Sequence, residues 1–550
     1  MSCDDAIIKR ATHHLVIGEP QEALKEIEAA YLEQKSDTLL RLKIVCTAKL
    51  EQEKEMLQAF VDYFPRHASD SQLAEEVVWA LIKKGSHNRS AAVRFEAILA
   101  AYMQHSAKTV GLLLESLDDP HLGLQLFSLF CCRTFSDSVI CEKILAKLKN
   151  SPKRVKLACI ETLGEMRSKK ALTTLRELLT EESDPETLSF LIQAVCKIVD
   201  AISFDDFTQC CQSKKASLRQ LAPALYFKER REEFLPLLLS LINDESKEVQ
   251  NLTLQAIGLC QMPISEETKK QLIEKMTGQD PHASILASFA LLGTEGLSLQ
   301  AQEKLSQWGS CDDAGVKLVA NLAICHGGAH TEELALKRLQ EEKDPIIIIN
   351  LSAFLIQRRQ SLELACHKMQ EALLKAGRLS QNENGFFSYI GKTTLQHTDA
   401  IPRYPEAQDL AVRLKLYSMM VSCNVEVSIP LQSIFQENKV PLQIAACELL
   451  FNEKGEIALE SIAELLSDPN DKVQCGAAIV LAALSQDETA AVKLQEHYEH
   501  AAVADQEEIL FAIGVIGSKN SIPFCIKALD GCSPGLKLRA ATALYLCLNH

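Results

Sequence analysis

At 550 residues the chain is too long for one hydrophobic core, so it must contain several domains or an array of repeats. Glycine (22) and proline (17) are scarce and aromatic residues make up only 5%, a composition that favours helices over a β-rich fold. The net charge of −15 argues against nucleic acid as the main partner, and no apolar run reaches the roughly 18 residues that cross a bilayer.

The first 87 residues differ from the rest of the chain. The opening MSCDDAIIKRATHH has no apolar segment of the kind that directs secretion, so we expect a cytoplasmic protein. Gly18 is followed by Ala23, Ile27 and Ala30, which resembles the turn and second helix of a tetratricopeptide unit, where small residues let two helices approach closely. We predict that residues 1–87 form a helical-hairpin cap over the first face of a repeat array.

A period of about 31–32 residues begins near residue 88 and is clearest in residues 151–184, which read as two short amphipathic helices. Aspartate precedes proline at residues 119, 184, 280, 344 and 468, in steps of 65, 96, 64 and 124 residues that are multiples of this period. Aspartate caps the free N–H groups of a helix and proline at the first helical position loses no hydrogen bond. Each of these dipeptides therefore predicts the start of a helix.

The apolar residue that opens each first helix can be aligned along the chain, to within about one residue. The aligned positions are Val93, Leu124, Val155, Leu188, Leu218, Val249, Ser284, Val316, Ile347, Val412, Leu442, Val473, Asp505 and Leu538. Nine residues later a small residue recurs, where the first helix must pass close to its neighbour; examples are Gly164, Gly258, Gly293, Cys325 and Gly514.

This pattern resembles the HEAT-repeat family, in particular its bacterial phycobilisome-lyase-like branch, which LFAIGVIGSKNSIPFCIKAL (510–529) follows well. The resemblance implies an all-α, armadillo-like, right-handed solenoid of about fourteen stacked antiparallel helix pairs. We predict arrays over residues 88–379 and 407–550. The matching residues are packing residues, so the resemblance says little about activity.

An insertion separates the two arrays. Residues 380–406 are polar and rich in turn formers, and the segment carries Phe386, Phe387, Tyr389 and Tyr404. Insertions in solenoids map to one face and often bind partners, so we predict that these aromatic residues contribute to a partner site.

No catalytic arrangement can be assigned, so we expect no enzyme, no cofactor and no bound metal. Five residues separate Gly385 from Gly391-Lys392-Thr393, whereas a phosphate loop has four between its glycines. No histidine is followed by glutamate, unlike the iron ligands of the HEAT-repeat deoxyhypusine hydroxylases. The 19 cysteines include no CxxC spacing, and we expect most of them to be small apolar core residues.

Positive charge gathers in two stretches, residues 143–176 and 214–231. Stacking could align them into one patch for an anion, an acidic protein or nucleic acid, or they could pair with nearby carboxylates such as Glu182 and Asp184. The predicted binding residues in the first stretch are Lys147, Lys149, Lys153, Arg154, Arg167, Lys169 and Lys170.

The final helix, residues 535–550, carries leucines on most of its surface. We expect it to pack on residues 522–529 and to leave an apolar strip that favours weak self-association. Our leading hypothesis for the whole chain is a non-enzymatic scaffold or adaptor that binds a protein partner on an extended helical surface. The alternatives are a phycobilisome-lyase-like or chaperone-like protein that handles a chromophore or client subunit, and an anion- or nucleic-acid-binding protein that uses the basic stretches.

Overall fold

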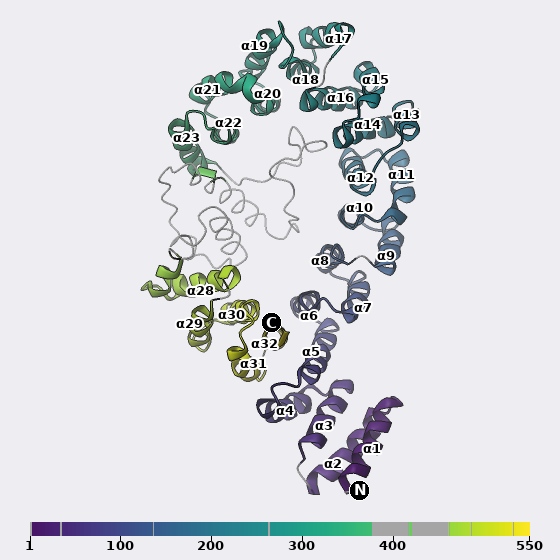
Figure 1. Cartoon of the computed structure of the whole chain (residues 1–550), viewed down its shortest axis with the longest axis vertical. Coiled ribbons are helices and arrows are strands. Elements are labelled where there is room, and N and C mark those ends of the chain that lie inside the picture. The colour runs from purple at the N-terminus through teal and green to yellow at the C-terminus, as the bar shows by residue number, and fades with distance from the viewer. Residues whose placement is uncertain are drawn as a thin grey trace. The chain divides into compact units, whose positions relative to one another are not determined.

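The computed structural model of the chain describes residues 3–33, 36–135, 137–261, 264–376, 462–485, 487–531 and 533–549, with four isolated residues between 416 and 460. Within these ranges every regular element is a helix, and short turns join the helices into pairs (Figure 1). None of the described helices is both long enough and apolar enough to cross a bilayer.

Five helices precede the repeats: α1 (Cys3–Val16), α2 (Pro20–Glu33), α3 (Asp37–Lys49), α4 (Glu53–Tyr63) and α5 (Ser71–Ser86). Helices α1 and α2 form a hairpin whose turn contains Gly18 at a φ of +84°, a left-handed conformation that glycine adopts readily. Ala23 and Ile27 in this hairpin are fully buried, as their spacing predicts.

The first helices of the repeats are α6 (Ala91–Gln104), α8 (Leu122–Cys132), α10 (Lys153–Glu165), α12 (Pro185–Ile198), α14 (Ala216–Glu229), α16 (Lys247–Cys260), α18 (Pro281–Leu291), α20 (Ala314–His326), α22 (Pro345–Gln357), α28 (Asp471–Ser485), α30 (Val503–Ile516) and α32 (Pro534–Asn549). The second helices are α7 (Ala107–Ser116), α9 (Ser138–Leu148), α11 (Leu172–Glu181), α13 (Phe204–Cys211), α15 (Leu235–Ser240), α17 (Glu266–Thr277), α19 (Ser298–Gly309), α21 (Glu332–Glu341), α23 (Leu362–Lys375), α29 (Glu488–Tyr498) and α31 (Ile522–Ala528). Short 3-10 turns lie at Phe64–Arg66, Lys169–Ala171, Glu232–Phe234, Leu241–Asn243, Gly328–Thr331, Leu465–Ser467 and Lys519–Ser521.

The predicted helix starts are observed. The carboxylates of Asp184, Asp280 and Asp344 accept hydrogen bonds from main-chain N–H groups in the first turns of α12, α18 and α22, and proline follows each aspartate. Every aligned first-helix residue that the structure describes lies within the first five residues of its helix. Val412 and Leu442 lie outside the described residues.

Small residues set the spacing between neighbouring first helices. A Cβ atom added at Gly164 of α10 would lie 2.9 Å from the Ala194 Cα of α12, and one added at Gly514 of α30 would lie 3.0 Å from the Ala543 Cα of α32. At Gly258 the obstacle is the side chain of Phe289. The helices therefore approach closely where a side chain is missing. Gly293 departs from this pattern, because the nearest atom, on His330, is 3.9 Å away.

Charged side chains also link consecutive repeats. Arg94 lies 2.7 Å from Asp119, and Arg219 lies 2.6 Å from Asp244, in both cases across 25 residues of sequence. Both ion pairs are largely buried, with the Arg219 and Asp244 side chains 7% and 6% exposed. Because a buried charge is stable only when it is paired, each arginine fixes the distance between its repeat and the next.

The prediction of an all-α solenoid of stacked helix pairs is confirmed for the described residues. Neighbouring first helices pack on one another from α10 to α22 and again from α28 to α32, with second helices beside them. The total of about fourteen pairs stays a prediction, because most of residues 377–461 lie outside the described part.

The chain divides into two compact units, one made of residues 1–131 and 430–550 and the other of residues 132–429. This division is one of spatial compactness, and the predicted boundaries of the cap, the two arrays and the insertion stay a prediction about the order of segments along the chain. The first unit contains both the helices that precede the repeats and the array that ends in α32.

Inside the first unit, α32 packs on α30 and α31 and also on α5 and α6 (Figure 1). The predicted packing on residues 522–529 is therefore confirmed, but the predicted apolar strip is wrong. Leu536, Leu538, Ala541 and Leu544 are buried, and Leu546 and Leu548 are half-buried. Because α5 and α6 cover this surface, the argument for self-association through α32 no longer holds.

Candidate functional site

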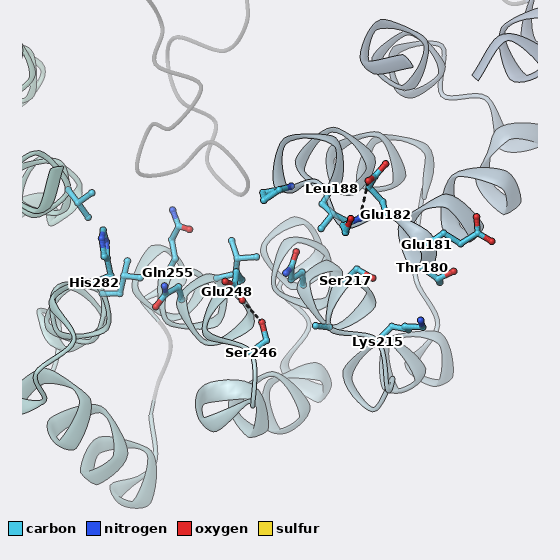
Figure 2. A pocket seen from close by; sticks show the side chains of 18 residues that line it. Thr180, Glu181, Glu182, Leu188, Lys215, Ser217, Ser246, Glu248, Gln255 and His282 are labelled. Atoms are coloured by element: carbon cyan, nitrogen blue, oxygen red, sulfur yellow. Dashed lines mark hydrogen bonds between the residues drawn. The ribbon is translucent and has the colours of Figure 1, made fainter. Parts of the chain in front are cut away.

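The second unit contains a groove of about 710 Å³ that crosses five successive first helices, from α12 to α20 (Figure 2). The loop after α11 forms one end and α20 contributes Val319 at the other. The lining residues are Thr180, Glu181, Glu182, Ser183, Pro185, Leu188, Lys215, Ala216, Ser217, Gln220, Ser246, Glu248, Asn251, Leu252, Gln255, His282, Leu286 and Val319.

The repeat itself places the polar groups of this groove. Gln220 on α14 and Asn251 on α16 each lie two residues after the aligned residue that opens their helices, Leu218 and Val249. Stacking therefore brings the two amides onto the same side of adjacent repeats. Both are half-buried, and neither makes a side-chain hydrogen bond to another described residue.

Hydrogen bonds near the N-termini of α16 and α12 hold the carboxylates of the groove in place. At the start of α16, the hydroxyl of Ser246 donates to the Glu248 carboxylate over 2.7 Å (Figure 2). Glu182, in the loop before α12, accepts a hydrogen bond of 2.7 Å from Lys156 and two more from the N–H groups of Ser183 and Asp184.

These hydrogen bonds keep the carboxyl groups ionised at neutral pH. The bond from Lys156 is the largest cause that lowers the pKa of Glu182, and the bond from Ser246 is the largest that lowers the pKa of Glu248. Lysine already compensates Glu182, whereas Glu181 is exposed and forms no ion pair with another described residue. The groove therefore presents fixed negative charge beside neutral amides and the apolar side chains of Leu188, Leu252 and Leu286.

This combination suits recognition rather than reaction. Amide side chains donate and accept hydrogen bonds with the main chain of an extended peptide, while leucine side chains contact its apolar groups. Among the described lining residues His282 is the one histidine and there is no cysteine. No group of three or more His, Cys, Asp and Glu residues in the described part is placed to hold a metal ion.

Three of the seven basic residues predicted as a binding site in the first stretch contact acidic neighbours. Lys153 lies 2.9 Å from Asp184 and 2.6 Å from Glu186, Lys169 lies 2.6 Å from Asp200, and Lys170 lies 3.3 Å from Glu142. Hydrogen bonds from Thr187 and then from Lys153 lower the pKa of Asp184 to about 2. The pairing with carboxylates that the sequence left open is thus observed for these lysines.

The other four residues of that prediction lie at helix ends and in turns of the same repeats. Lys147 lies in α9, Lys149 directly follows this helix, and Arg154 is exposed in the first turn of α10. Arg167 lies in the turn after α10 with a φ of +49°. The proposal of a single anion-binding patch therefore rests on charges that come from separate turns.

Several residues of the second basic stretch are bound by neighbouring groups of the chain. Lys228 donates to the carbonyl of Cys196 over 2.8 Å, and Arg231 donates to the carbonyl of Ile202 over 2.7 Å. Arg219 is held by Asp244, which leaves exposed Lys215 as the member of this stretch that lines the groove. The predicted aromatic site at Phe386, Phe387, Tyr389 and Tyr404 lies outside the described residues.

Sequence reasoning missed the groove because each of its residues is ordinary by itself. The available signal was positional: Gln220 and Asn251 occupy the same place in adjacent repeats, on the helix side that does not face the core. An alignment of repeats that scored polar positions as well as apolar ones would have found the pair.

The fold is that of a helical-repeat protein of the solenoid class, and a groove runs along its first helices from α12 to α20. No protein-family model matches the chain, and no curated protein matches its sequence. Among solved structures, the chain is similar to importin beta in an ammonium sulfate condition, at 12% identity over 98% of this chain and 86% of that chain, with a TM-score of 0.35. It is also similar to the UNC-45 chaperone, at 11% identity over 99% and 96% of the two chains (TM-score 0.32), and to Kap121p, at 14% over 98% and 77% (TM-score 0.32).

Proposed function

We propose that the protein is a non-enzymatic scaffold that binds an extended segment of a protein partner in the groove formed by α12, α14, α16, α18 and α20. The observation that carries this proposal is the pair of amides, Gln220 and Asn251, at equivalent positions of adjacent repeats. An extended peptide repeats its main-chain donors and acceptors at regular intervals, so regularly placed amides are suited to bind it.

The groove is favoured over the basic stretches because its polar groups remain available. Lys153, Lys169 and Lys170 are already paired with carboxylates of the chain, and a partner would have to replace those contacts. The amides of Gln220 and Asn251 have no side-chain hydrogen bond within the described part, so a peptide can bind them without breaking one. The phycobilisome-lyase-like and nucleic-acid-binding alternatives have no comparable feature among the described residues.

A photocrosslinking amino acid placed at position 220 or 251 of the full chain tests the proposal. We expect both positions to crosslink to the same short peptide of one partner, identified by mass spectrometry of the crosslinked fragments. The control position is Lys270, which is exposed on α17 beside α16 and lies outside the groove. Crosslinks from Lys270 to the same peptide, or different peptides from positions 220 and 251, would contradict the proposal.

A blocking variant provides the second arm of the test. Ser217→Trp would fill the groove next to Gln220, whereas Lys270→Trp adds the same side chain outside it. We expect Ser217→Trp to abolish binding of the identified peptide while the thermal unfolding midpoint is retained, and Lys270→Trp to change neither. Equal peptide affinity in both variants would show that the groove is not the binding site.

A further inference from the structure

The contact of α32 with α5 and α6 joins segments more than 400 residues apart in the sequence, within the first unit. Leu538 is the central apolar residue of this contact. A Cβ atom added at Gly85 of α5 would lie 2.8 Å from its Cδ1 atom, and the Cβ of Ala97 on α6 lies beside Gly85 as well. On the other side, Ala543 packs on Gly514 of α30. The side chain of Leu538 against Gly85 and the close backbone approach of Ala543 to Gly514 therefore hold α32 between α5 and α30.

A cluster of charges lies within this apolar contact. The Nε atom of Arg539 on α32 is 2.6 Å from a carboxylate oxygen of Glu96 on α6, and both side chains are only 12% exposed. Arg539 also lies over the ring of Phe511, 5.4 Å from its centroid. On α30, Glu507 lies so close to α32 that a Cβ atom at Gly535 would be 2.7 Å from its carboxylate. The next residue, Glu508, interacts with both Arg539 and Glu507.

The Arg539 guanidinium therefore interacts with two carboxyl groups, Glu96 and Glu508, on two helices that do not share a repeat, and Glu507 lies close by. Burial is the largest cause that raises the pKa of Glu96, to about 7; Arg539 opposes this shift, and Glu507 and Glu508 add to it. Burial also raises the pKa of Glu508. The positive charge of Arg539 lowers this pKa, and the negative charges of Glu507 and Asp505 raise it further. The cluster can thus hold a proton near neutral pH.

Other charged groups near the contact are already paired. Lys537 of α32 and Lys84 of α5 each lie 2.8 Å from Glu53, and these two lysines outweigh burial and lower the pKa of that carboxyl group. Lys108 of α7 lies 3.6 Å from Glu75 of α5, and Arg94 of α6 lies 2.7 Å from Asp119. His87, which follows α5, lies 3.9 Å from Glu115 of α7. Glu96 and Glu508 are thus the carboxyl groups of this contact whose pKa burial raises.

From this geometry we infer that the contact of α32 with α5 and α6 is a proton-sensitive latch, which uptake of a proton by the buried carboxyl groups of Glu96 and Glu508 beside Arg539 tightens and loss of that proton loosens. When α32 leaves, Glu96 meets water and its pKa returns to the ordinary value near 4.3. The docked state binds the proton more tightly than the undocked state does. Docking is therefore strongest at a pH below the ordinary pKa of Glu96, where both states are protonated. The advantage is lost as the pH rises through about 7. The docking equilibrium should fall roughly tenfold to thirtyfold between about pH 5.5 and about pH 8.

Hydrogen exchange of the full chain, read by mass spectrometry and corrected for the intrinsic effect of pH, tests this inference. Peptides from α32, α5 and α6 should lose protection between about pH 5.5 and about pH 8, by the same roughly tenfold to thirtyfold factor. In Glu96→Gln the side chain no longer titrates, so protection of these peptides should vary little with pH. The control Glu115→Gln removes an exposed carboxylate on α7 and should retain the wild-type profile.

Glu508→Gln separates a latch from a merely structural contact. Removing this negative neighbour lowers the pKa of Glu96 in the docked state, so the loss of protection should end at lower pH and be smaller than in the wild type. If Glu96→Gln and wild type show the same pH profile, or if Glu508→Gln lowers protection equally at every pH, the inference is wrong.

Discussion

Single glycines show how the repeat controls helix spacing at the residue scale. Gly164 lies inside α10, where helix propensity alone favours alanine by about 1 kcal/mol. The added Cβ would lie 2.9 Å from the Ala194 Cα, a main-chain atom that can move only with α12. We therefore expect Gly164→Ala to lower the thermal unfolding midpoint, because the clash outweighs the gain in propensity.

Gly111 supplies the matched control. It also lies inside a helix, α7, but nothing lies within 4 Å of the position its Cβ would occupy. Gly111→Ala should raise the unfolding midpoint or leave it unchanged, since only the propensity term remains. Equal effects of the two substitutions would show that spacing between α10 and α12 does not depend on Gly164.

The residue scale is also where sequence reasoning succeeded most. Capping by Asp184, Asp280 and Asp344 depends on the next three residues alone, so the Asp-Pro dipeptides predicted it correctly. The buried ion pair of Arg219 and Asp244 escaped notice, although its spacing of 25 residues recurs in Arg94 and Asp119. Arg219 was interpreted as part of a basic surface stretch, because a count of charged residues does not tell which of them are buried.

At the scale of single elements, α32 gives the clearest difference between expectation and structure. Its leucines predicted an uncovered side, whereas Leu544 is fully buried. Glutamate at this position would place a charge in an apolar contact. Burying that charge would lower the free energy of unfolding by about 3 kcal/mol or more, unless α32 separates from α5 and α6. Leu544→Glu should therefore expose α32, α5 and α6 to limited proteolysis and lower the urea midpoint.

Asn549→Glu is the control for that substitution. Asn549 is exposed in the last turn of the same helix, so the same new charge stays in water. Its proteolysis pattern should match that of the wild type. If Leu544→Glu is equally resistant, α5 and α6 do not cover α32 in solution.

The spacing of apolar residues along α32 could not predict which helices cover it. Spacing of apolar residues tells which side of α32 needs cover, but any apolar surface satisfies that need. The actual cover, α5 and α6, lies more than 400 residues away and follows from tertiary packing. The packing on α31 was predicted correctly because neighbouring repeats in a solenoid always contact one another.

At the scale of the whole molecule, the alkylation rates of cysteine thiols measure how well the cores of both units are buried. Burial raises the pKa of Cys46 to about 11 and those of Cys132 and Cys159 to about 12, and the thiolate is the reactive form. These thiols should resist alkylation in the native protein near pH 8 and react readily in denaturant. Mass spectrometry of labelled peptides would measure each site separately.

Cys311 serves as the internal comparison, because it lies half-exposed in the turn after α19. It should be labelled much faster than Cys159 in the native state and at a similar rate in denaturant. Native labelling of Cys159 at the rate of Cys311 would contradict its place in the core. The sequence-based view of most cysteines as small core residues agrees with the burial of nine of the fifteen that the structure describes.

The latch between α32 and the α5–α6 pair also has a consequence for biosynthesis. Glu53 leaves the ribosome 484 residues before its partner Lys537, which at about 5–20 residues per second is a delay of roughly 25 to 100 s. During that interval the face of α5 and α6 that receives Leu538 has no cover from α32. The nascent chain thus presents an apolar surface for much longer than neighbouring repeats need to pair, and this face is the part of the first unit most exposed to aggregation during synthesis.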